Sequence, residues 1–466
     1  MKLKNKNCNN CLNSCFKQHV YKSPKGLNEQ IIKNISEEKN EPDWMLQLRL
    51  KAFEFFQFEK FPAWGPDLSK LDIQNLYYYI KKTNKKETSW NDVPHDIKNT
   101  FDQLGLQKIE KEYLGGLGAQ YESETVYHNL KQEWQERGVI FCDTDTALQK
   151  HFDIFKKYFG TVVGYKDNKF AALNTAVWSG GSFIYVPKGV NVTIPLQAYY
   201  RIDSQNFGQF ERTLIIADEN SSVSYIEGCT APKNSENDLH SAVVEIIAHK
   251  NAKVKYYTIQ NWSKSVYNLV TKRALAHENS IIEWIDGNIG SGITMKYPGV
   301  ILKGQGAKTE ILSLAMAGQK NQIQDSGARV FHLAQNTSSK VVSKSISCNG
   351  GRSSFRAKVK VIKNAKQSKS FIQCDSLLLD DKSRADAYPY LEIQEKNINV
   401  GHEAKINKIE EEKLFYLQSR GIKPLDAQAL IVNGFIDSFT KELPPEYAIE
   451  INRLIEAEMK GEKNEL

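Results

Sequence analysis

The middle of the chain repeats a turn followed by a strand at a nearly constant interval. Asn and Gly tolerate the left-handed backbone conformation that tight turns require. Each turn precedes alternating apolar and polar residues, and the steps are 31, 28, 27, 30 and 28 residues between Asn220, Asn251, Asn279, Gly306, Asn336 and Asn364. A fixed period of this size indicates a solenoid, because each unit can bury its apolar face only against its neighbours.

The repeat predicts a mainly β protein with a β-helix-like solenoid core. A sandwich or a barrel usually has shorter and less regular intervals between turns. A doubly wound fold needs helical segments between its strands, and we expect none in residues 159–400. The period-two alternation of β-branched, aromatic and polar residues supports strands throughout this region.

The segments on either side of the repeat have a different pattern. Residues 26–158 contain amphipathic stretches typical of helices, and residues 42–56 are an example. From residue 406 the helical period returns, and three short helices are expected before the end of the chain. We therefore predict a flexible cysteine-containing tail (residues 1–25), a helix-rich N-terminal region (26–158), the β-helix (159–400) and a C-terminal helical domain (401–466).

Composition excludes several classes of function. The 62 Lys and Arg residues exceed the 55 Asp and Glu residues by only 7 over 466 residues, without a long basic block, so nucleic-acid binding has little support. No apolar run reaches the roughly 18 residues of a membrane span, and the N-terminus lacks the apolar core of a secretory signal. We expect a soluble intracellular protein. The seven cysteines are an odd number and form a poor disulfide framework, which favours reduced thiols for metal or sulfur chemistry.

A candidate iron-binding set lies near the C-terminal end of the repeat. Cys374 precedes the adjacent pair His402 and Glu403 by about thirty residues. A thiolate, an imidazole and a carboxylate can together hold iron, and they hold it less tightly than four thiolates would. In the alternative interpretation, Cys374 is a small buried hydrophobic residue, and His402 with Glu403 caps the first C-terminal helix.

A second candidate metal site lies at the N-terminus. Cys8, Cys11, Cys15 and His19 fall within twelve residues, and a Cys-x2-Cys spacing can bring two sulfurs onto one zinc ion or cluster. The segment is polar and terminal, however, and disorder is the usual state of such a segment.

Nine short motifs in order resemble one family, the SufB scaffold subunits of the SUF iron-sulfur cluster assembly system, within the wider SufB/SufD family. The likeness runs from about Gly26 to Glu458. The motifs are Gln209-Phe-Glu-Arg-Thr, Tyr225-Ile-Glu-Gly-Cys-Thr, Ile259-Gln-Asn-Trp, Val270-Thr-Lys-Arg, Lys296-Tyr-Pro, Lys340-Val-Val-Ser-Lys, Gln373-Cys-Asp-Ser, His402-Glu-Ala-Lys and Ile431-Val-Asn-Gly-Phe.

The resemblance implies a fold and a function. The fold would be a right-handed parallel β-helix between helical N- and C-terminal regions. The function would be that of a scaffold for de novo cluster assembly, which accepts persulfide sulfur and iron, builds a nascent cluster and transfers it to acceptor proteins. Such a subunit is not itself an enzyme, and the partner ATPase SufC would drive the process. The chain has no phosphate-binding loop of its own.

The resemblance also assigns roles to residues. The sulfur-accepting thiol would be Cys229, and the nascent cluster would bind to Cys374, Glu403 and His402. Sulfur would pass along a path lined by Arg201, Gln260, Trp262 and Lys272, although Gln260, Trp262 and Lys272 could equally serve solenoid packing or a solvated strand edge. A cation near a thiol favours the thiolate that attacks a persulfide. The chain departs from the family at two positions, because Gly401 replaces a Glu and Asp203 replaces an Asn.

Partners, cofactors and compartment follow from the same resemblance. SufC would dock on the C-terminal helices, SufD or a second copy of this chain would bind through the β-helix, and a donor of the SufE/SufS or SufU type would supply sulfur. The cofactors expected are a transient iron-sulfur cluster and, as a further candidate, reduced flavin. The compartment would be the bacterial cytoplasm or the stroma of a plastid or apicoplast. The alternatives are a structural paralogue of the SufD kind and a polysaccharide-cleaving β-helix enzyme, and the second needs clustered carboxylates or calcium sites that we do not find.

Overall fold

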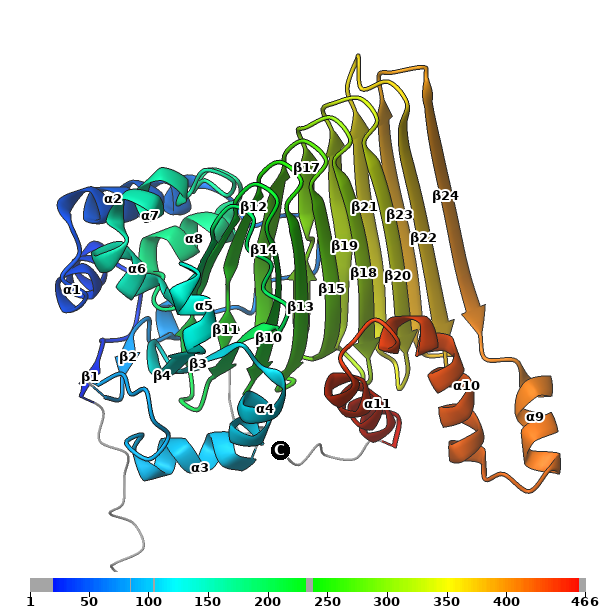
Figure 1. The fold of residues 1–466 in the computed structure, drawn as a ribbon. Coiled ribbons are helices and arrows are strands. Elements are labelled where there is room, and N and C mark those ends of the chain that lie inside the picture. The colour runs from blue at the N-terminus through cyan, green and yellow to red at the C-terminus, as the bar shows by residue number, and fades with distance from the viewer. Residues whose placement is uncertain (1–19, 84, 104, 232–237, 461–466) are drawn as a thin grey trace, which may run out of the picture.

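The computed structural model describes residues 20–460 except residues 84, 104 and 232–237. Two long, mostly parallel sheets face each other and form a β-solenoid of about 7 turns, with helices at both ends of the chain (Figure 1). The prediction of a mainly β protein with a parallel β-helix core is confirmed. The predicted turns are also present, because all six have positive φ, between 54° and 73°, at Asn220, Asn251, Asn279, Gly306, Asn336 and Asn364.

The first sheet contains ten strands and supplies most of the candidate residues. Its order along the sheet is β24 (Ile398–Lys408), β22 (Ser368–Leu378), β20 (Ser338–Ser347), β18 (Lys308–Ala317), β15 (Ile281–Gly290), β13 (Lys253–Trp262), β10 (Ser222–Thr230), β7 (Leu196–Arg201), β3 (Gly116–Tyr121) and β4 (Glu124–Leu130). All neighbours are parallel except β3 and β4.

The second sheet contains twelve strands and closes the other side of the solenoid. Its main path is β23 (Arg384–Ile393), β21 (Arg352–Val361), β19 (Ile323–His332), β16 (Ile293–Lys296), β14 (Tyr267–Ala276), β12 (Val243–Ala248), β9 (Arg212–Ala217), β6 (Ser182–Val186) and β5 (Ile140–Asp143). The short strands β8 (Gly208–Gln209), β11 (Leu239–His240) and β17 (Gly299–Leu302) lie beside this path.

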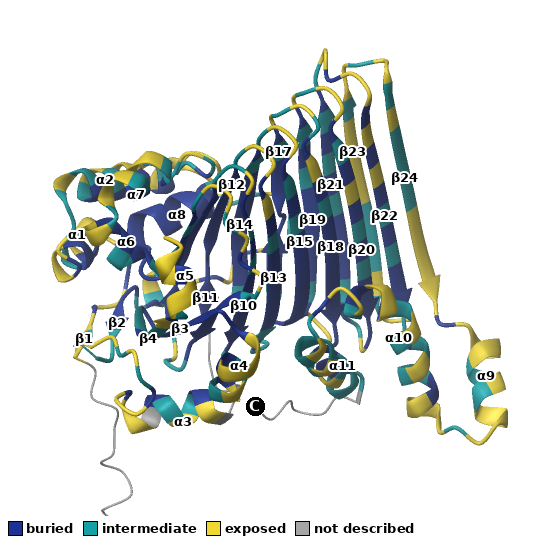
Figure 2. Ribbon diagram, viewed as in Figure 1, coloured by how far each residue is buried: buried dark blue, intermediate teal, exposed yellow. Residues whose placement is uncertain are grey.

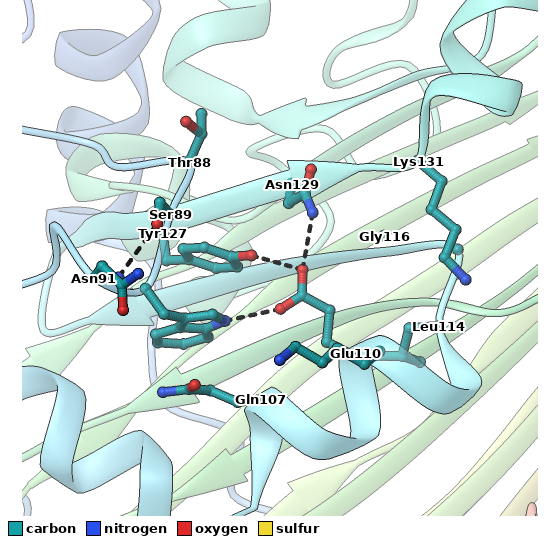
Figure 3. A pocket seen from close by; sticks show the side chains of 13 residues that line it. Thr88, Ser89, Asn91, Gln107, Glu110, Leu114, Gly116, Tyr127, Asn129 and Lys131 are labelled. Carbon is teal, nitrogen blue, oxygen red and sulfur yellow. Dashed lines mark hydrogen bonds between the residues drawn. The ribbon is translucent and has the colours of Figure 1, made fainter.

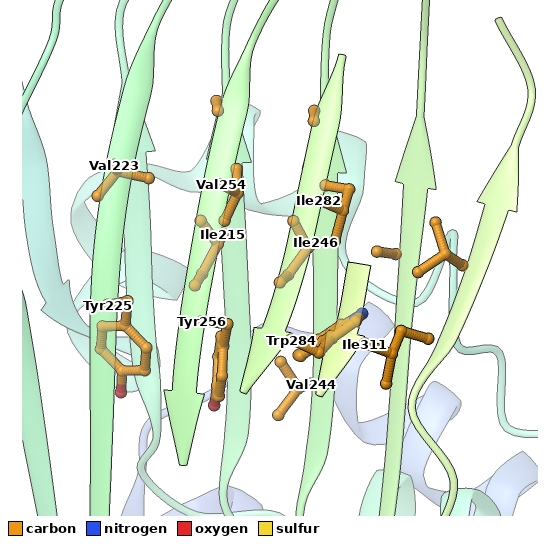
Figure 4. Packing of buried hydrophobic residues seen from close by; sticks show 14 of the residues in the cluster. Ile215, Val223, Tyr225, Val244, Ile246, Val254, Tyr256, Ile282, Trp284 and Ile311 are labelled. Atoms are coloured by element: carbon orange, nitrogen blue, oxygen red, sulfur yellow. The ribbon is translucent and has the colours of Figure 1, made fainter. Parts of the chain in front are cut away.

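Stacked apolar side chains fill one half of the solenoid interior (Figure 4). Residues opposite each other in the parallel register form straight rows: Val223, Val254 and Ile282 make one, and Tyr225, Tyr256, Trp284 and Ile311 make the next. The central strands are almost entirely buried, as Figure 2 shows. Each fully buried side chain of this size contributes roughly 1.5–3 kcal/mol of burial free energy, so these rows stabilise the solenoid.

The N-terminal region is helical but also contributes strands. Its helices are α1 (Glu29–Glu38), α2 (Asp43–Phe58), α3 (His95–Gln103), α4 (Leu106–Tyr113), α5 (Gln132–Glu136), α6 (Thr144–Lys150) and α7 (Phe152–Tyr158), with a 3-10 turn at Ile73–Asn75. The strands β3, β4 and β5 of this region extend the two sheets of the solenoid. The pairing of β1 (Tyr21–Lys22) with β2 (Ile80–Lys81) shows that the last residues of the predicted tail belong to the folded protein.

One helix interrupts the region where we expected only strands. Helix α8 (Lys169–Val177) is buried at every position and packs with α1 and α2 on the outer face of the second sheet. The expectation of no helix between residues 159 and 400 is therefore wrong at this point. The helix begins at Asn168, whose side chain accepts hydrogen bonds from the backbone N–H groups of Phe170 and Ala171.

Three helices follow the solenoid, as predicted: α9 (Glu411–Ser419), α10 (Pro424–Thr440) and α11 (Pro445–Lys460). Helices α10 and α11 pack on the outer face of the first sheet, where Ile436, Phe439 and Ile451 meet apolar residues of β13, β15 and β18. Strand β24 continues to Lys408, so the sheet runs past the predicted boundary at residue 400.

The last turn of the solenoid has no covering layer in the described part of the chain. Strands β23 and β24 are each the final strand of their sheet, so one side of each strand has no neighbour. Several of their inward-facing side chains are exposed, with Leu391 at 40%, Ile393 at 45% and Ile406 at 45%. We call these two strands the open end. No helix among the described residues is long and apolar enough to cross a membrane.

Candidate functional site

Cys229 lies inside the solenoid, near the end of β10. Its side chain is buried in the main interior cluster, opposite Tyr200 on one neighbouring strand and Gln260 on the other. The Gln260 amide Nε2 donates to Cys229 Sγ at 3.9 Å, and the thiol donates to Glu227 Oε1 at 3.9 Å. Burial raises the pKa of the Cys229 thiol well above its ordinary value, Glu227 and Glu211 raise it further, and Lys272 and Lys296 oppose the rise.

Two buried lysines reach across the interior from the second sheet. Lys272 Nζ lies 3.2 Å and Lys296 Nζ 3.4 Å from Asp286 Oδ1 on β15. Lys296 also donates to Gln260 Oε1 at 3.1 Å, which connects this charged group to Cys229. Burial lowers the pKa of Lys296 to about 8, although Asp286 acts against the change. Burial alone would raise the pKa of Asp286, but the two ammonium groups lower it.

Trp262 belongs to the same buried group. Its ring packs against the ring of His240 with centroids 4.6 Å apart. His240 Nε2 lies 3.0 Å from Glu211 Oε2, and His240 Nδ1 lies 2.8 Å from Asn268 Oδ1. Burial by itself lowers the pKa of His240, but Glu211 outweighs it and the pKa is raised. Asn268 then donates to Gln260 Oε1 at 2.9 Å, so one hydrogen-bonded network extends from Glu211 to Cys229.

Arg201 is the exception among the five residues predicted for sulfur transfer. It follows Tyr200, the residue opposite Cys229, and successive strand residues point to opposite faces of a sheet. Its guanidinium donates to Thr230 Oγ1 at 3.0 Å on the outer face. The structure therefore joins Cys229, Gln260, Trp262 and Lys272 through the interior and places Arg201 outside it.

Inward-facing polar residues connect the Cys229 region with Cys374. The register between successive turns aligns them one to one in a row whose members are Glu227, Thr258, Asp286, Ser313, Ser343 and Cys374. A parallel row begins at Cys229, contains Gln260, Asn288, Ser345 and Ser376, and is interrupted by the apolar Ala315. The Asn288 amide is buried, and neither its oxygen nor its nitrogen has a hydrogen-bond partner among the described residues. Polar side chains thus line the interior between the Cys229 region and Cys374.

Cys374 faces inward on β22, one strand before the open end. Only 1% of its surface is exposed, and Ala404 of β24 lies opposite it. Burial raises the pKa of the Cys374 thiol to about 11, with Ser376 opposing and Asp375 assisting the rise. This thiol is therefore on the strand next to β24, which belongs to the open end.

His402 and Glu403 lie on opposite faces of β24. His402 stands opposite the inward-facing Ile372, and its Nε2 is buried without a hydrogen-bond partner in the described part of the chain. Glu403 faces outward and forms an ion pair with Lys405 at 2.6 Å. The structure brings His402 to the same face as Cys374 and does not bring Glu403 there. The alternative that this pair caps a helix is wrong, because α9 begins only at Glu411.

The described residues do not form a complete metal site. No group of three or more His, Cys, Asp or Glu side chains within residues 20–460, apart from the undescribed gaps, could hold a metal ion. A metal ion held by Cys374 and His402 would therefore need further ligands from beyond the described residues. The N-terminal candidates Cys8, Cys11, Cys15 and His19 lie outside the described residues. At the two departures, Gly401 stands opposite Phe371, and Asp203 accepts a hydrogen bond from Tyr121 at 2.6 Å.

Two cavities were not predicted from the sequence. One, of about 490 Å³, lies beside Glu110 in the N-terminal region (Figure 3). The Glu110 carboxylate accepts hydrogen bonds from Trp90 Nε1, Tyr127 OH and Asn129 Nδ2 at 2.8, 2.6 and 3.1 Å. This carboxylate therefore already has hydrogen-bond partners within the protein. No sequence pattern indicates this cavity, because its lining comes from segments that meet only in the fold.

The second cavity, of about 280 Å³, lies between α4, α11 and the first sheet. Gly228, Cys229 and Thr230 contribute to its lining. The Tyr447 hydroxyl of α11 donates to Gln197 Oε1 at 2.6 Å across it. The cavity lies on the outer face of the sheet, whereas the Cys229 side chain points into the interior cluster.

Comparisons with known proteins agree on one family. Residues 200–435 match the family model described as the SUF system FeS cluster assembly, SufBD core domain, and residues 27–198 match the SufBD protein N-terminal region. Proteins named iron-sulfur cluster assembly SufBD family protein from Staphylococcus epidermidis, Staphylococcus aureus and Staphylococcus haemolyticus are each 57% identical to this chain over 442 residues. The matches cover 95% of this chain and 95% of each relative.

Proposed function

This chain belongs to the SufBD family of iron-sulfur cluster assembly proteins, and from that premise we propose that it is the SufB-type scaffold of the SUF system. The observation that carries the proposal is the inward-facing polar row between the Cys229 region and Cys374. A subunit with a purely structural role would have no need of a buried thiol, Cys374, at one end of such a row and a second thiol, Cys229, beside Glu227 at the other end. The chain itself is not an enzyme in this proposal, and SufC hydrolyses the ATP.

Sulfur enters at Cys229 and moves toward Cys374. A thiol that receives sulfur becomes a persulfide, which is more acidic than a thiol and is therefore an anion at neutral pH. Lys272 and Lys296 place two ammonium groups in the same buried network. The serines of the row offer hydroxyl donors to an anionic sulfur species on its way to the open end.

The nascent cluster is cargo that forms at the open end. Cys374 supplies a thiolate and His402 an unpartnered imidazole nitrogen on the same face. The remaining ligands would come from a second subunit, either SufD or another copy of this chain. The exposed edges of β23 and β24, with the apolar side chains of Leu391 and Ile393, are suited to pairing with strands of that subunit.

The C-terminal helices provide a mechanical connection to a partner ATPase. Helices α10 and α11 pack directly on the strands of the first sheet, whereas α9 and the start of α10 expose Phe415, Tyr416 and Leu425 to solvent. SufC would bind this exposed surface, and a shift of the helices would displace strands that bury Cys374. Reduced flavin finds no support in the described residues. The staphylococcal relatives favour the bacterial over the plastid compartment.

Anaerobic reconstitution with two sulfur sources tests the proposal. Cys374→Ala should abolish cluster formation with either inorganic sulfide or a cysteine desulfurase, because it removes the assembly ligand. Cys229→Ala should abolish formation only with the desulfurase, because free sulfide bypasses the entry thiol. Cys348→Ala is the matched control, since this buried cysteine packs with the C-terminal helices on the other face of the sheet. Equal iron content in all four proteins with both sources would refute the assignment.

A further inference from the structure

Glu227 is a buried carboxylate in contact with Cys229 to which no role has been assigned. We propose that Glu227 is the catalytic base of sulfur acceptance, taking the thiol proton of Cys229 as its sulfur attacks the donor persulfide. The inference rests on the proposed function and names the residue that makes the entry thiol reactive.

The geometry places both groups on one face of one strand. Glu227 precedes Cys229 by two residues on β10, so both side chains point into the solenoid. The Cys229 thiol donates to Glu227 Oε1 at 3.9 Å. The other carboxylate oxygen, Oε2, accepts a hydrogen bond from the Tyr256 hydroxyl. Glu227 is therefore held with one oxygen fixed and the other directed at the reacting sulfur.

The reaction balances without an external oxidant or reductant. The Cys229 sulfur forms a bond to the outer sulfur of the donor persulfide while the donor's own S–S bond breaks. The donor leaves as a thiolate and takes the proton that Glu227 removed from Cys229. The products are the Cys229 persulfide and the donor thiol, so one sulfur atom has moved and the overall oxidation state is unchanged.

A base is needed because the thiol is poorly acidic in this environment. The thiolate is the nucleophile in persulfide transfer, whereas burial raises the pKa of Cys229 well above its ordinary value. Removing the proton during attack, rather than before it, avoids a free buried thiolate. General base catalysis of this kind typically contributes about 10²–10⁴-fold in rate.

The charge of Glu227 should slow sulfur acceptance, whereas its action as a base should speed it. This difference in sign makes the inference testable. As a fixed negative charge, Glu227 raises the pKa of Cys229 and so disfavours the thiolate. If the carboxylate acted only as a charge, Glu227→Gln would lower that pKa and speed sulfur acceptance. If it acts as a base, the same substitution slows the reaction.

The other charged and titratable groups around this centre stay in place in the variant. They come from the strands packed against it and from the segment between β8 and β9: Tyr200, Glu211, Tyr225, His240, Tyr256, Lys272, Asp286 and Lys296. Glutamine is nearly isosteric with glutamate, and its amide oxygen can still accept from Tyr256. The change is therefore confined to the loss of the base and its charge.

The experiment follows sulfur transfer from glutathione persulfide to Cys229 in the full-length protein under anaerobic conditions. Persulfide on the Cys229 peptide is trapped by alkylation and quantified by mass spectrometry between pH 6.5 and 9.5. Glu227→Gln should be at least about tenfold slower than wild type at pH 7. The difference should shrink as pH rises, because hydroxide then replaces the missing base. Glu310→Gln, which removes an exposed carboxylate paired with Lys340, is the control and should match wild type.

The outcomes separate this inference from the proposed function. No sulfur on Cys229 in the wild-type protein contradicts the proposed function itself. Sulfur on Cys229 with Glu227→Gln as fast as wild type, or faster, overturns the role of Glu227 and leaves the entry thiol in place. If Glu227→Gln does not fold, Glu227→Asp provides the test. This variant keeps the negative charge but moves the carboxylate away from Cys229 by one methylene, so its sulfur acceptance should be slower than that of wild type. A rate for that variant equal to wild type at pH 7 also overturns the inference.

Discussion

Lys296 is a buried ammonium whose removal should stabilise the protein. Its side chain is fully buried between Gln260 and Asp286. Methionine has a similar length and no charge, so Lys296→Met fills the same space without the cost of burying an ion. Asp286 remains paired with Lys272 at 3.2 Å, and the substitution therefore leaves no isolated buried carboxylate.

The pKa of Lys296 sets the size of the effect. A fall from the ordinary value of 10.5 to about 8 is roughly 2.5 pH units, which corresponds to roughly 3 kcal/mol of destabilisation when the group is charged. The hydrogen bond to Gln260 is worth about 1 kcal/mol and is lost in the variant. Lys296→Met should therefore raise the free energy of unfolding at pH 7 by about 2 kcal/mol.

The gain should depend on pH with a definite sign. Between pH 8 and 10.5 the unfolded chain binds a proton at Lys296 and the native chain does not, so the stability contribution of this group rises with pH. The destabilisation caused by the buried Lys296 charge is fully present below pH 8 and absent above pH 10.5. The advantage of the methionine variant should consequently fade across this range and reverse to a loss of about 1 kcal/mol at its upper limit.

Urea unfolding followed by tryptophan fluorescence at pH 7, 8, 9 and 10 measures the difference directly. Trp178 and Trp284 are fully buried and report on loss of the core. Lys340→Met is the control, because Lys340 is exposed and its substitution should give a small difference that does not change with pH. A methionine variant less stable than wild type at pH 7, or a difference constant with pH, would refute the reasoning.

Two further predictions concern the open end. His402→Ala should lower the iron retained after reconstitution at least about tenfold, because His402 shares the inward face with Cys374. Glu403→Gln should have a smaller effect, since Glu403 points outward. Iron analysis after desalting would show the reverse order if the assignment of faces is wrong. Leu391→Arg, alone or with Ile393→Arg, should shift the sedimentation coefficient from that of a complex toward that of the single chain, because it places charges on the apolar face offered to a second subunit. A variant that sediments like the wild-type complex would contradict this prediction.

The sequence predicted the solenoid because its signal is local and repeated. Each Asn or Gly turn needs only its own backbone conformation, and all six adopt it. Helix α8 gave no such signal. All its residues are buried, so no polar face marks the helical period, and a short apolar run cannot be distinguished from a buried strand.

The structure brings together only some of the residues that the sequence predicted for the candidate site. His402 and Glu403 are adjacent in sequence, and in a strand adjacent residues must face opposite ways. The interpretation of this pair as the start of a helix did not take this alternation into account. For that reason it missed that only one of the two side chains can share a face with Cys374. Arg201 lies on the outer face for the same reason, because it is one residue out of phase with Tyr200, the residue opposite Cys229. A one-residue difference in register decides which face a side chain occupies.

The same strands carry both the stabilising core and the candidate chemistry. In β10, Val223 and Tyr225 belong to the apolar rows, whereas Glu227 and Cys229 begin the polar ones. Because each turn stacks on the next in one-to-one register, this division is repeated along the solenoid and produces a continuous polar row beside a continuous apolar one. Burying charges such as Asp286 costs stability that an apolar row would not. A β-helix under selection for stability alone would extend the apolar rows across the whole interior, so the retained polar row supports the proposal that sulfur moves through the interior.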